Sequence, residues 1–215
     1  AIVDDAVVEA DETIELKLSS VSPQVTLGLQ VTTGYTIRND DTATLTIDSA
    51  SVVEGTGAGT TTLTFTVTLD AAVQDGLTVA FSDLAGTAGA TDYTVTTVSP
   101  LTFLGTAGET QTISVDITRD AIVESGEQFT VTLGTVMAAT AVQTAAITTG
   151  ASGTGTITND DTATLAIGSP TVTEGTGAGT TTLTFTVSSD AAVQDGFTVA
   201  FSDLAGTAGA TDYTV

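Results

Sequence analysis

The chain has 215 residues, with 26 acidic and only three basic side chains, so its formal net charge at pH 7 is −23. This charge excludes nucleic acid and anionic membrane surfaces as partners, because both require basic side chains that neutralise phosphate. The chain has no cysteine or histidine, which closes most nucleophilic and metal-hydrolase chemistry, and we expect no enzymatic activity. It also lacks an apolar stretch of about 18 residues, so no direct membrane insertion is expected.

Alternating side chains predict strands along the chain. Leu63, Phe65, Val67 and Leu69 alternate with threonines, which gives one apolar face and one hydrated face. The same pattern recurs, between breaks rich in Gly and Asp, at 77–81, 101–103, 113–117 and 129–133. Six to eight short strands in about 120 residues are typical of an all-β, immunoglobulin-like two-sheet β-sandwich.

Other segments between these strands are expected to be irregular. No segment shows helical periodicity, and we expect 134–155 to form a long loop or hairpin. A shorter insert at 21–34 occupies the corresponding place in the preceding sequence. The glycine-rich stretch 55–60 has no following lysine or helix, so it is interpreted as a hairpin turn rather than a phosphate-binding loop. Tyr35, Tyr93 and Tyr213 are interpreted as packing anchors.

The chain repeats itself with a period of 120 residues. Segments 40–95 and 160–215 differ at only eight of 56 positions. The repeat predicts the C-terminal half of one unit at 1–41, a complete unit at 42–161 and the N-terminal half of a further unit at 162–215. Since both ends fall inside units, we expect the chain to be part of a longer tandem array, with any secretion signal outside it.

An Asn-Asp-Asp motif stands at each junction between units, at 39–41 and again at 159–161. A strand pattern lies on each side, and no flexible linker separates the two. Adjacent ionised carboxylates repel each other unless a hard, oxygen-seeking cation bridges them. The motif therefore predicts a divalent cation at the junction.

Four motifs of the complete unit, taken together, resemble the Calx-beta domain. They are Glu54 in Val-Val-Glu-Gly, Gly-Thr-Ala-Gly-Ala-Thr-Asp-Tyr at 86–93, the acidic stretch 120–127 and the closing Asn-Asp-Asp. That domain is an immunoglobulin-like sandwich known from sodium–calcium exchangers and from long bacterial surface proteins. The resemblance implies tandem Calx-beta repeats of a large bacterial cell-surface or extracellular protein.

The resemblance also implies calcium as the bound cofactor, at one end of each sandwich. Carried onto the complete unit, the implied ligands are Glu54, Asp92, Asp120, Glu124, Glu127, Asp160 and Asp161. In the first half-unit they are Asp4, Asp5, Glu9, Glu12, Asp40 and Asp41, and in the last they are Glu174 and Asp212. The alternative to a calcium site is that these carboxylates are solvated charges that keep the sandwich soluble.

Two departures from the family pattern weaken the site in the complete unit. Arg119 stands where an acidic ligand is expected, and Asn159 replaces an aspartate, so its carbonyl would ligate with less charge. We therefore expect fewer ions there than in the first half-unit, which has Asp4 at the position of Arg119. Affinities of about 10⁻⁴–10⁻³ M, typical of extracellular modules, make calcium a stabilising constant rather than a signal.

The preferred function is structural: a repeat module of an extracellular filament, sheath or adhesin stalk, stiffened by calcium at inter-domain joints. Its partners would be neighbouring repeats of the same or identical chains. One alternative is an adhesive module that binds a host or surface ligand through the loops at 21–34 and 134–155. Another is a filament subunit in which 162–215 of one copy and 1–41 of another complete a sandwich by strand exchange. A glycosidase is disfavoured, because no insertion builds a cleft.

Overall fold

The computed structural model describes residues 1–19 and 22–215; Val21, where the predicted insert begins, lies outside them. The chain divides into two compact units. Unit 1 comprises residues 1–120 and 126–160, and unit 2 comprises residues 121–125 and 161–215. Among the described residues, no helix has the length and hydrophobicity that crossing a membrane requires.

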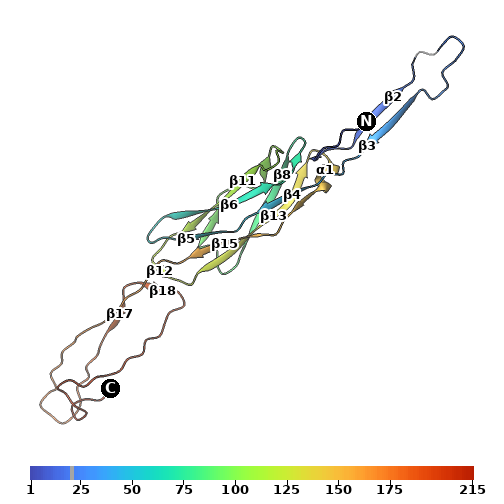
Figure 1. Cartoon of the computed structure of the whole chain (residues 1–215). Coiled ribbons are helices and arrows are strands. Elements are labelled where there is room, and N and C mark those ends of the chain that lie inside the picture. Colours follow the sequence, from blue (N-terminus) through green and yellow to red (C-terminus); the bar gives the residue numbers. More distant parts are fainter. Residues whose placement is uncertain (20–21) are drawn as a thin grey trace. The chain divides into compact units, whose positions relative to one another are not determined.

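Unit 1 contains a β-sandwich built from two five-stranded sheets, as the sequence predicts (Figure 1). The first sheet has the order β10 (Leu101–Phe103), β8 (Leu77–Ala85), β13 (Glu127–Ala138), β15 (Gly153–Thr158) and β5 (Ala50–Val53). The second has the order β14 (Ile147–Thr149), β4 (Ala43–Ile47), β6 (Thr60–Leu69), β11 (Thr110–Thr118) and β9 (Tyr93–Val95). All five strand segments predicted from alternation lie within these strands.

The apolar faces of the two sheets meet in one core. In β6, Leu63, Phe65, Val67 and Leu69 are buried, while the threonines between them stay more exposed. The ring of Phe129 stacks on Tyr93 with 4.0 Å between centroids and meets Phe65 edge-on at 5.9 Å. Tyr93 is therefore a packing anchor, as predicted, whereas Tyr35 is 59% exposed and is not.

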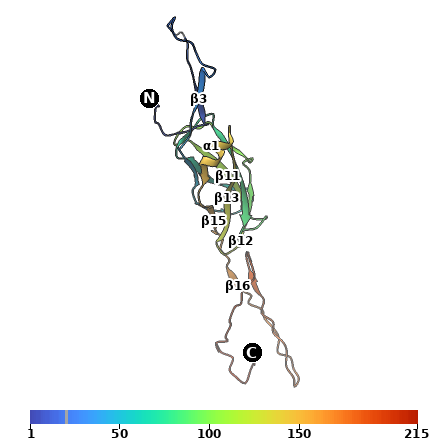
Figure 2. The same ribbon diagram turned by 90° about the vertical axis from the view of Figure 1, so that its right-hand side faces the viewer.

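Four two-stranded pairings complete the described strands. In unit 1, β1 (Val7–Val8) pairs with β7 (Ala72–Val73), and β2 (Glu12–Lys17) forms a ribbon with β3 (Thr32–Ile37) (Figure 2). In unit 2, β12 (Ile122–Val123) pairs with β18 (Ala192–Val193), and β16 (Leu165–Ile167) pairs with β17 (Val187–Ser189). Unit 2 leaves exposed the positions that form the core of the complete repeat: Phe185 is 56% exposed, and its equivalent Phe65 is 0% exposed.

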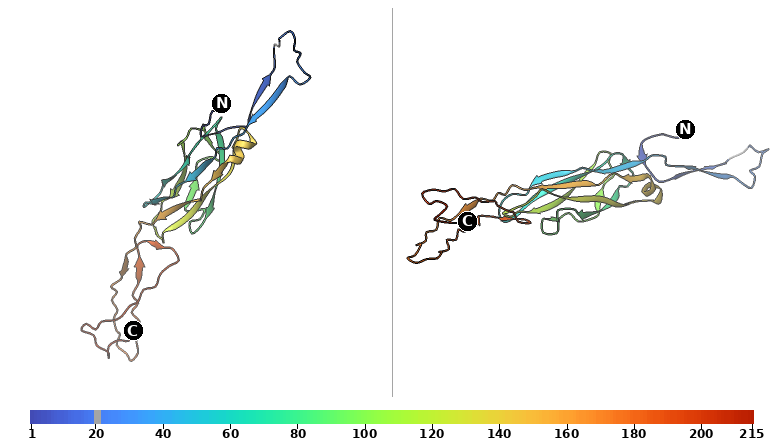
Figure 3. Two further views of the ribbon diagram at one scale, coloured as in Figure 1. Left: turned by 45° about the vertical axis from the view of Figure 1, so that its right-hand side comes forward. Right: turned by 90° about the horizontal axis from the view of Figure 1, so that it is seen from below.

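Two predictions about irregular segments are wrong. Segment 134–155 continues β13, forms the helix α1 (Ala141–Ala146) and then adds β14 (Figure 3). The helix has six residues, too few to show a period, but Thr140 and Gln143 form a capping box that stabilises its start. The glycine-rich stretch 55–60 is not a hairpin turn, because β5 and β6 belong to different sheets.

The close approach of Gly155 to Phe129 predicts that a larger side chain at this glycine destabilises the protein. A Cβ atom at Gly155 would lie 2.5 Å from Cζ of Phe129, and that ring cannot move because Tyr93 and Phe65 hold it. We expect Gly155→Ala to lower the free energy of unfolding by about 1–3 kcal/mol, the usual cost of overpacking. Urea unfolding followed by circular dichroism measures the loss. Gly34→Ala, also in a strand but with open space around it, should cost less than the core substitution.

The buried phenol of Tyr93 is expected to ionise at an unusually high pH. Burial, together with a 2.8 Å hydrogen bond from its hydroxyl to Asp83, raises the pKa of Tyr93 to about 12. Because the folded state favours the neutral phenol, its stabilising contribution is complete below about pH 10 and is lost as the pH rises towards 12. Ultraviolet titration should show this late ionisation, and Tyr93→Phe should remove it. Retention of the full late step in that variant would contradict the assignment.

Candidate metal centre

The parallel pairing of β5 with β15 brings distant carboxylates together. Val53 lies opposite Thr158 at the end of this pair, and the backbone N–H of Glu54 donates to the carbonyl of Thr158 at 3.1 Å. Parallel strands run in the same direction, so the residues that follow β5 and β15 emerge at the same edge. Glu54 and Asp160 therefore lie close together although they are far apart in the sequence. The backbone N–H of Gly55, which is 105 residues from Asp160, donates a 3.0 Å hydrogen bond to Asp160 Oδ1.

Glu54, Asp160 and Asp161 form a group of three carboxylates. Each offers one oxygen, and the three oxygens lie within 4.8 Å of one another. Asp160 is exposed, whereas Glu54 and Asp161 are only 4% and 7% exposed. At that separation, two ionised carboxylates repel by roughly 3 kcal/mol at an effective dielectric constant of about 20. All three donors are hard oxygens, so the group fits a cation such as Ca²⁺.

The other predicted ligands of the complete unit lie outside this group. Glu127 begins β13 opposite Ile157 and is buried, and Glu124 follows β12. The carbonyl of Asp120 accepts from Gly57 N–H at 2.7 Å. Asp92 caps its own turn: one carboxylate oxygen accepts from Gly89 N–H at 2.6 Å, and the other from the Thr91 hydroxyl at 2.9 Å.

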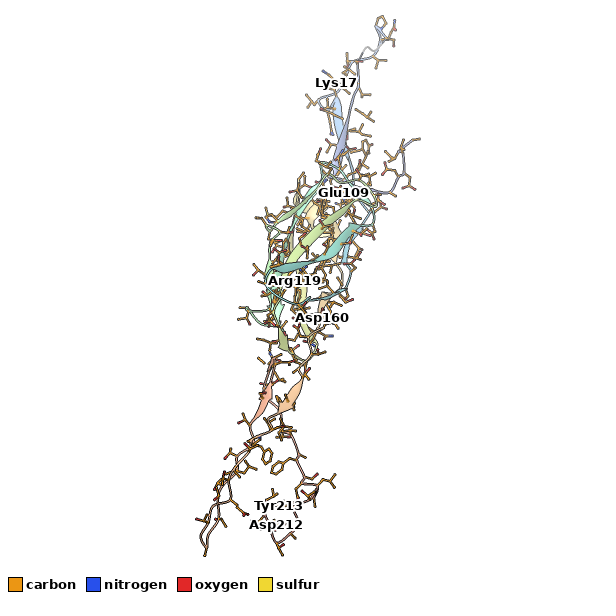
Figure 4. All side chains as sticks on the ribbon, turned by 90° about the vertical axis from the view of Figure 1, so that its left-hand side faces the viewer. Lys17, Glu109, Arg119, Asp160, Asp212 and Tyr213 are labelled. Carbon is orange, nitrogen blue, oxygen red and sulfur yellow. The ribbon has the colours of Figure 1, made fainter. Side chains whose placement is uncertain are left out.

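Arg119 lies beside the loop that carries Glu54, at the place where the family pattern has an acid. Its Nε donates to the Thr61 hydroxyl at 2.7 Å, and that hydroxyl donates to the carbonyl of Glu54 at 2.6 Å. Its side chain also covers Gly55, where a Cβ atom would lie 3.3 Å from Nε. Arg119 thus reaches the centre through Thr61 and Gly55. Figure 4 shows Asp160 at one end of the sandwich and Glu109 at the other.

The acidic residues of the first half-unit lie together in a separate pocket. A pocket of about 330 Å³ in unit 1 is lined by all six carboxylates that the sequence singles out there: Asp4, Asp5, Glu9, Glu12, Asp40 and Asp41. By the repeat, Asp40 and Asp41 are the counterparts of Asp160 and Asp161. Acids at equivalent positions therefore gather in two successive repeats. Asp40 and Asp41 are joined in this pocket by Arg38 and Asn39, so it is not purely acidic.

Asn39 has a structural role that the sequence did not reveal. Its Oδ1 accepts from Glu9 N–H at 2.8 Å, and its Nδ2 donates to the carbonyl of Asp41 at 2.9 Å. Its own N–H donates to the Asp11 carboxylate at 3.1 Å. Asn39 thereby ties the two acidic segments of the pocket together. An asparagine at this position is explained by its need to donate and accept at once, which an ionised aspartate cannot do.

In the last half-unit, the described residues gather no such group around the predicted ligands. Glu174 is exposed, and its carbonyl accepts from the Thr181 hydroxyl at 2.8 Å. Asp212 accepts from Gly209 N–H at 2.8 Å, the same turn cap that Asp92 makes one repeat earlier. The capping role of this aspartate is therefore a feature of the repeat.

Crowding of charge alters the pKa of two acids in the first pocket. Partial burial, followed by the charges of Asp5, Glu12 and Asp41, raises the pKa of Glu9. Partial burial, followed by the charges of Asp40, Asp5 and Asp4, raises the pKa of Asp41. The folded state therefore binds protons more tightly than the unfolded state, so these groups favour folding at low pH. That contribution is lost as the pH rises through their folded pKa values.

Comparison with known proteins gives only distant likenesses. No protein-family profile matches the chain, and no curated protein sequence matches it. Among solved structures, the apo form of the Calx CBD1 domain is similar with a TM-score of 0.45 and 16% identity, over 56% of this chain and all of that one. The Calx CBD2 domain has a TM-score of 0.37 and 12% identity, over 54% of this chain and 86% of that one. CBD12 from CALX1.2 has a TM-score of 0.41 and 14% identity; 55% of this chain matches 46% of that one.

Repulsion within the first pocket can be tested by removing one charge. Asp5 raises the pKa of both Glu9 and Asp41, so Asp5→Asn should lower both values. NMR titration of the side-chain carboxyl carbons measures the change. Glu15→Gln, an exposed glutamate of β2 that does not line the pocket, should leave both pKa values unchanged. Equal responses to the two substitutions would show that only the general charge of the chain acts.

Proposed function

We propose that this chain is a stretch of calcium-binding structural repeats from an extracellular or cell-surface filament, sheath or adhesin stalk. One observation carries the proposal. Four polar or charged residues are buried among those that the structure describes, and three of them, Glu54, Glu127 and Asp161, are ligands implied by the family resemblance. Burying carboxylates is costly unless their charge is compensated. The alternative, that these carboxylates are solvated surface charges, does not account for this burial.

The donor set favours calcium over other metals. The chain offers no cysteine or histidine, the ligands that zinc and copper sites prefer. Glu54, Asp160 and Asp161 supply oxygens alone, and calcium accepts six to eight oxygen ligands in flexible geometry. When bound, the ion would supply positive charge that offsets the repulsion among these carboxylates, and backbone carbonyls or water would complete its coordination.

A mechanical role is supported by the repeat itself. Successive repeats are nearly identical over 56 aligned positions, which suits a spacer in which every unit does the same task. Asp161 is followed without a linker by the strand pattern of the next repeat. An ion held by Asp160 and Asp161 would therefore stiffen the backbone where one repeat passes into the next, and neighbouring repeats are the partners we propose.

The adhesive alternative is disfavoured for one of its two loops. Segment 134–155 is part of the sandwich, because β14 pairs with β4 and the side chain of Gln143 is buried. A segment that contributes to the core has little freedom to vary for recognition. The structure thus favours a spacer over a module that binds ligands through this segment.

Calcium should stabilise the protein through Glu54. At 10 mM calcium and a Kd of about 1 mM, linkage predicts about 1.4 kcal/mol of added stability, which is a few degrees in Tm. Glu54→Gln should lose at least half of this gain. The calcium gain of each protein is taken relative to its own stability in chelator, so any effect of the substitution itself cancels. Thermal unfolding followed by circular dichroism, with and without calcium, measures both effects.

The matched control is Glu15→Gln, which removes a charge from an exposed strand outside the carboxylate groups and should keep the full calcium response. Sodium chloride at equal ionic strength should give a smaller gain than calcium. If sodium gave the same gain, or if both variants and the wild type responded equally, charge screening would explain the effect and the metal centre would be refuted.

A further inference from the structure

Each acidic segment continues into a two-residue strand that pairs with the following repeat. In unit 1, β1 pairs in parallel with β7, with Val7 opposite Ala72. In unit 2, β12 pairs in parallel with β18, with Ile122 opposite Ala192. The two pairings occupy equivalent positions of the repeat. In each, the donor belongs by sequence to one repeat and the acceptor to the next.

The same hydrogen bond closes both pairings. Gln74 N–H donates to the carbonyl of Val8 at 2.9 Å, and Gln194 N–H donates to the carbonyl of Val123 at 3.0 Å. The register is therefore reproduced in two units of different completeness. It does not depend on the rest of the sandwich, because unit 2 contains only part of one.

In the complete repeat, the donated strand also supplies a core side chain. Val8 is 0% exposed and belongs to the hydrophobic core of the sandwich. Val3, only five residues earlier, is 86% exposed. Full burial of a valine side chain removes its apolar surface from water, which is a substantial stabilisation for a segment of two residues.

The acceptor strand is held ready for its partner. Gln143 of α1 is 1% exposed, and its Nε2 donates to the carbonyl of Gln74 at 2.8 Å. Val73 N–H donates to the carbonyl of Gly105 at 2.9 Å. The loop at Gly105 is in turn held by the Glu109 carboxylate, which accepts from three successive backbone N–H groups. These bonds outweigh burial and lower the pKa of Glu109.

The donor is equally fixed in its own repeat. Val7 N–H donates to the Asp5 carboxylate at 3.0 Å, and Glu9 N–H donates to Asn39 Oδ1 at 2.8 Å. The sequence Asp-Ala-Val-Val-Glu at 5–9 recurs as Asp-Ala-Ile-Val-Glu at 120–124. Acidic residues therefore flank the apolar pair in both copies.

We propose that every repeat completes the sandwich of the repeat after it, by donating this apolar pair to the edge formed by β7 or its equivalent. The surface at β7 is an interface, and its partner is the Asp-Ala-(Val/Ile)-Val-Glu segment of a preceding copy. Successive repeats are then coupled by packing, independently of any metal ion.

Amide hydrogen exchange of the full chain tests the proposal. Val8→Ala should speed exchange of the Gln74 amide at least about tenfold, while the Gln194 amide is unchanged. Val123→Ala should do the reverse. Val8→Thr, which keeps the shape of valine but buries a hydroxyl, should act in the same direction as Val8→Ala. Val3→Ala, an equal truncation at an exposed site, should change neither amide.

Faster exchange throughout the sandwich in Val8→Ala, with Gln194 unchanged, also supports the proposal, because Val8 then stabilises the whole following repeat. Unchanged exchange of Gln74 in Val8→Ala overturns it. An unprotected Gln194 amide in the wild type overturns its extension to every repeat. All measurements are made in chelator, so failure of the calcium proposal would leave this result standing.

Discussion

Repulsion between carboxylates gathered at the end of the β5–β15 pair is the constraint on which this structure depends. Parallel pairing forces the residues after both strands to the same edge, and those residues are Glu54, Asp160 and Asp161. A chain of net charge −23 has few basic groups with which to offset this crowding. Arg119, one of the three basic residues, contacts the neighbouring loop at Thr61 and Gly55. Holding these acids together costs free energy, which packing of the sandwich core and nearby positive charge can offset.

Acidic and apolar roles are combined in the same short segment. Within 5–9, Asp5 and Glu9 line the acidic pocket, while Val8 enters the core beside β7. Any change in the charge state of the pocket therefore acts on residues covalently adjacent to a core side chain. This adjacency connects the electrostatics of one repeat with the packing of the next, whether or not a metal ion is bound.

The near-identical segments 40–95 and 160–215 show how far burial depends on residues distant in sequence. Phe65 is 0% exposed and Phe185 is 56% exposed, although their local sequences are the same. The difference arises because β11 and β13, which lie beside and opposite β6, have no counterparts within 161–215. An amphipathic strand acquires a core only when the second half of its repeat, or an equivalent segment of another copy, covers it.

By itself, the sequence determined five strands of the sandwich and the repeat, whereas the set of six acids in the first half-unit was implied by the family resemblance. Period-two alternation is a local pattern, and the 120-residue repeat is a match of the sequence to itself. A single sequence is therefore enough to detect both. Only the tertiary structure decided that β5 pairs with β15, that Asp92 caps its own turn, that Asn39 joins two acidic segments and that Val8 enters the following sandwich. The helix α1 was predictable only in part. Its capping box is visible in the sequence, but six residues are too few to show a helical period. Strand partners and side-chain contacts depend on residues up to about a hundred positions apart, and alternation is the same whichever partner a strand has.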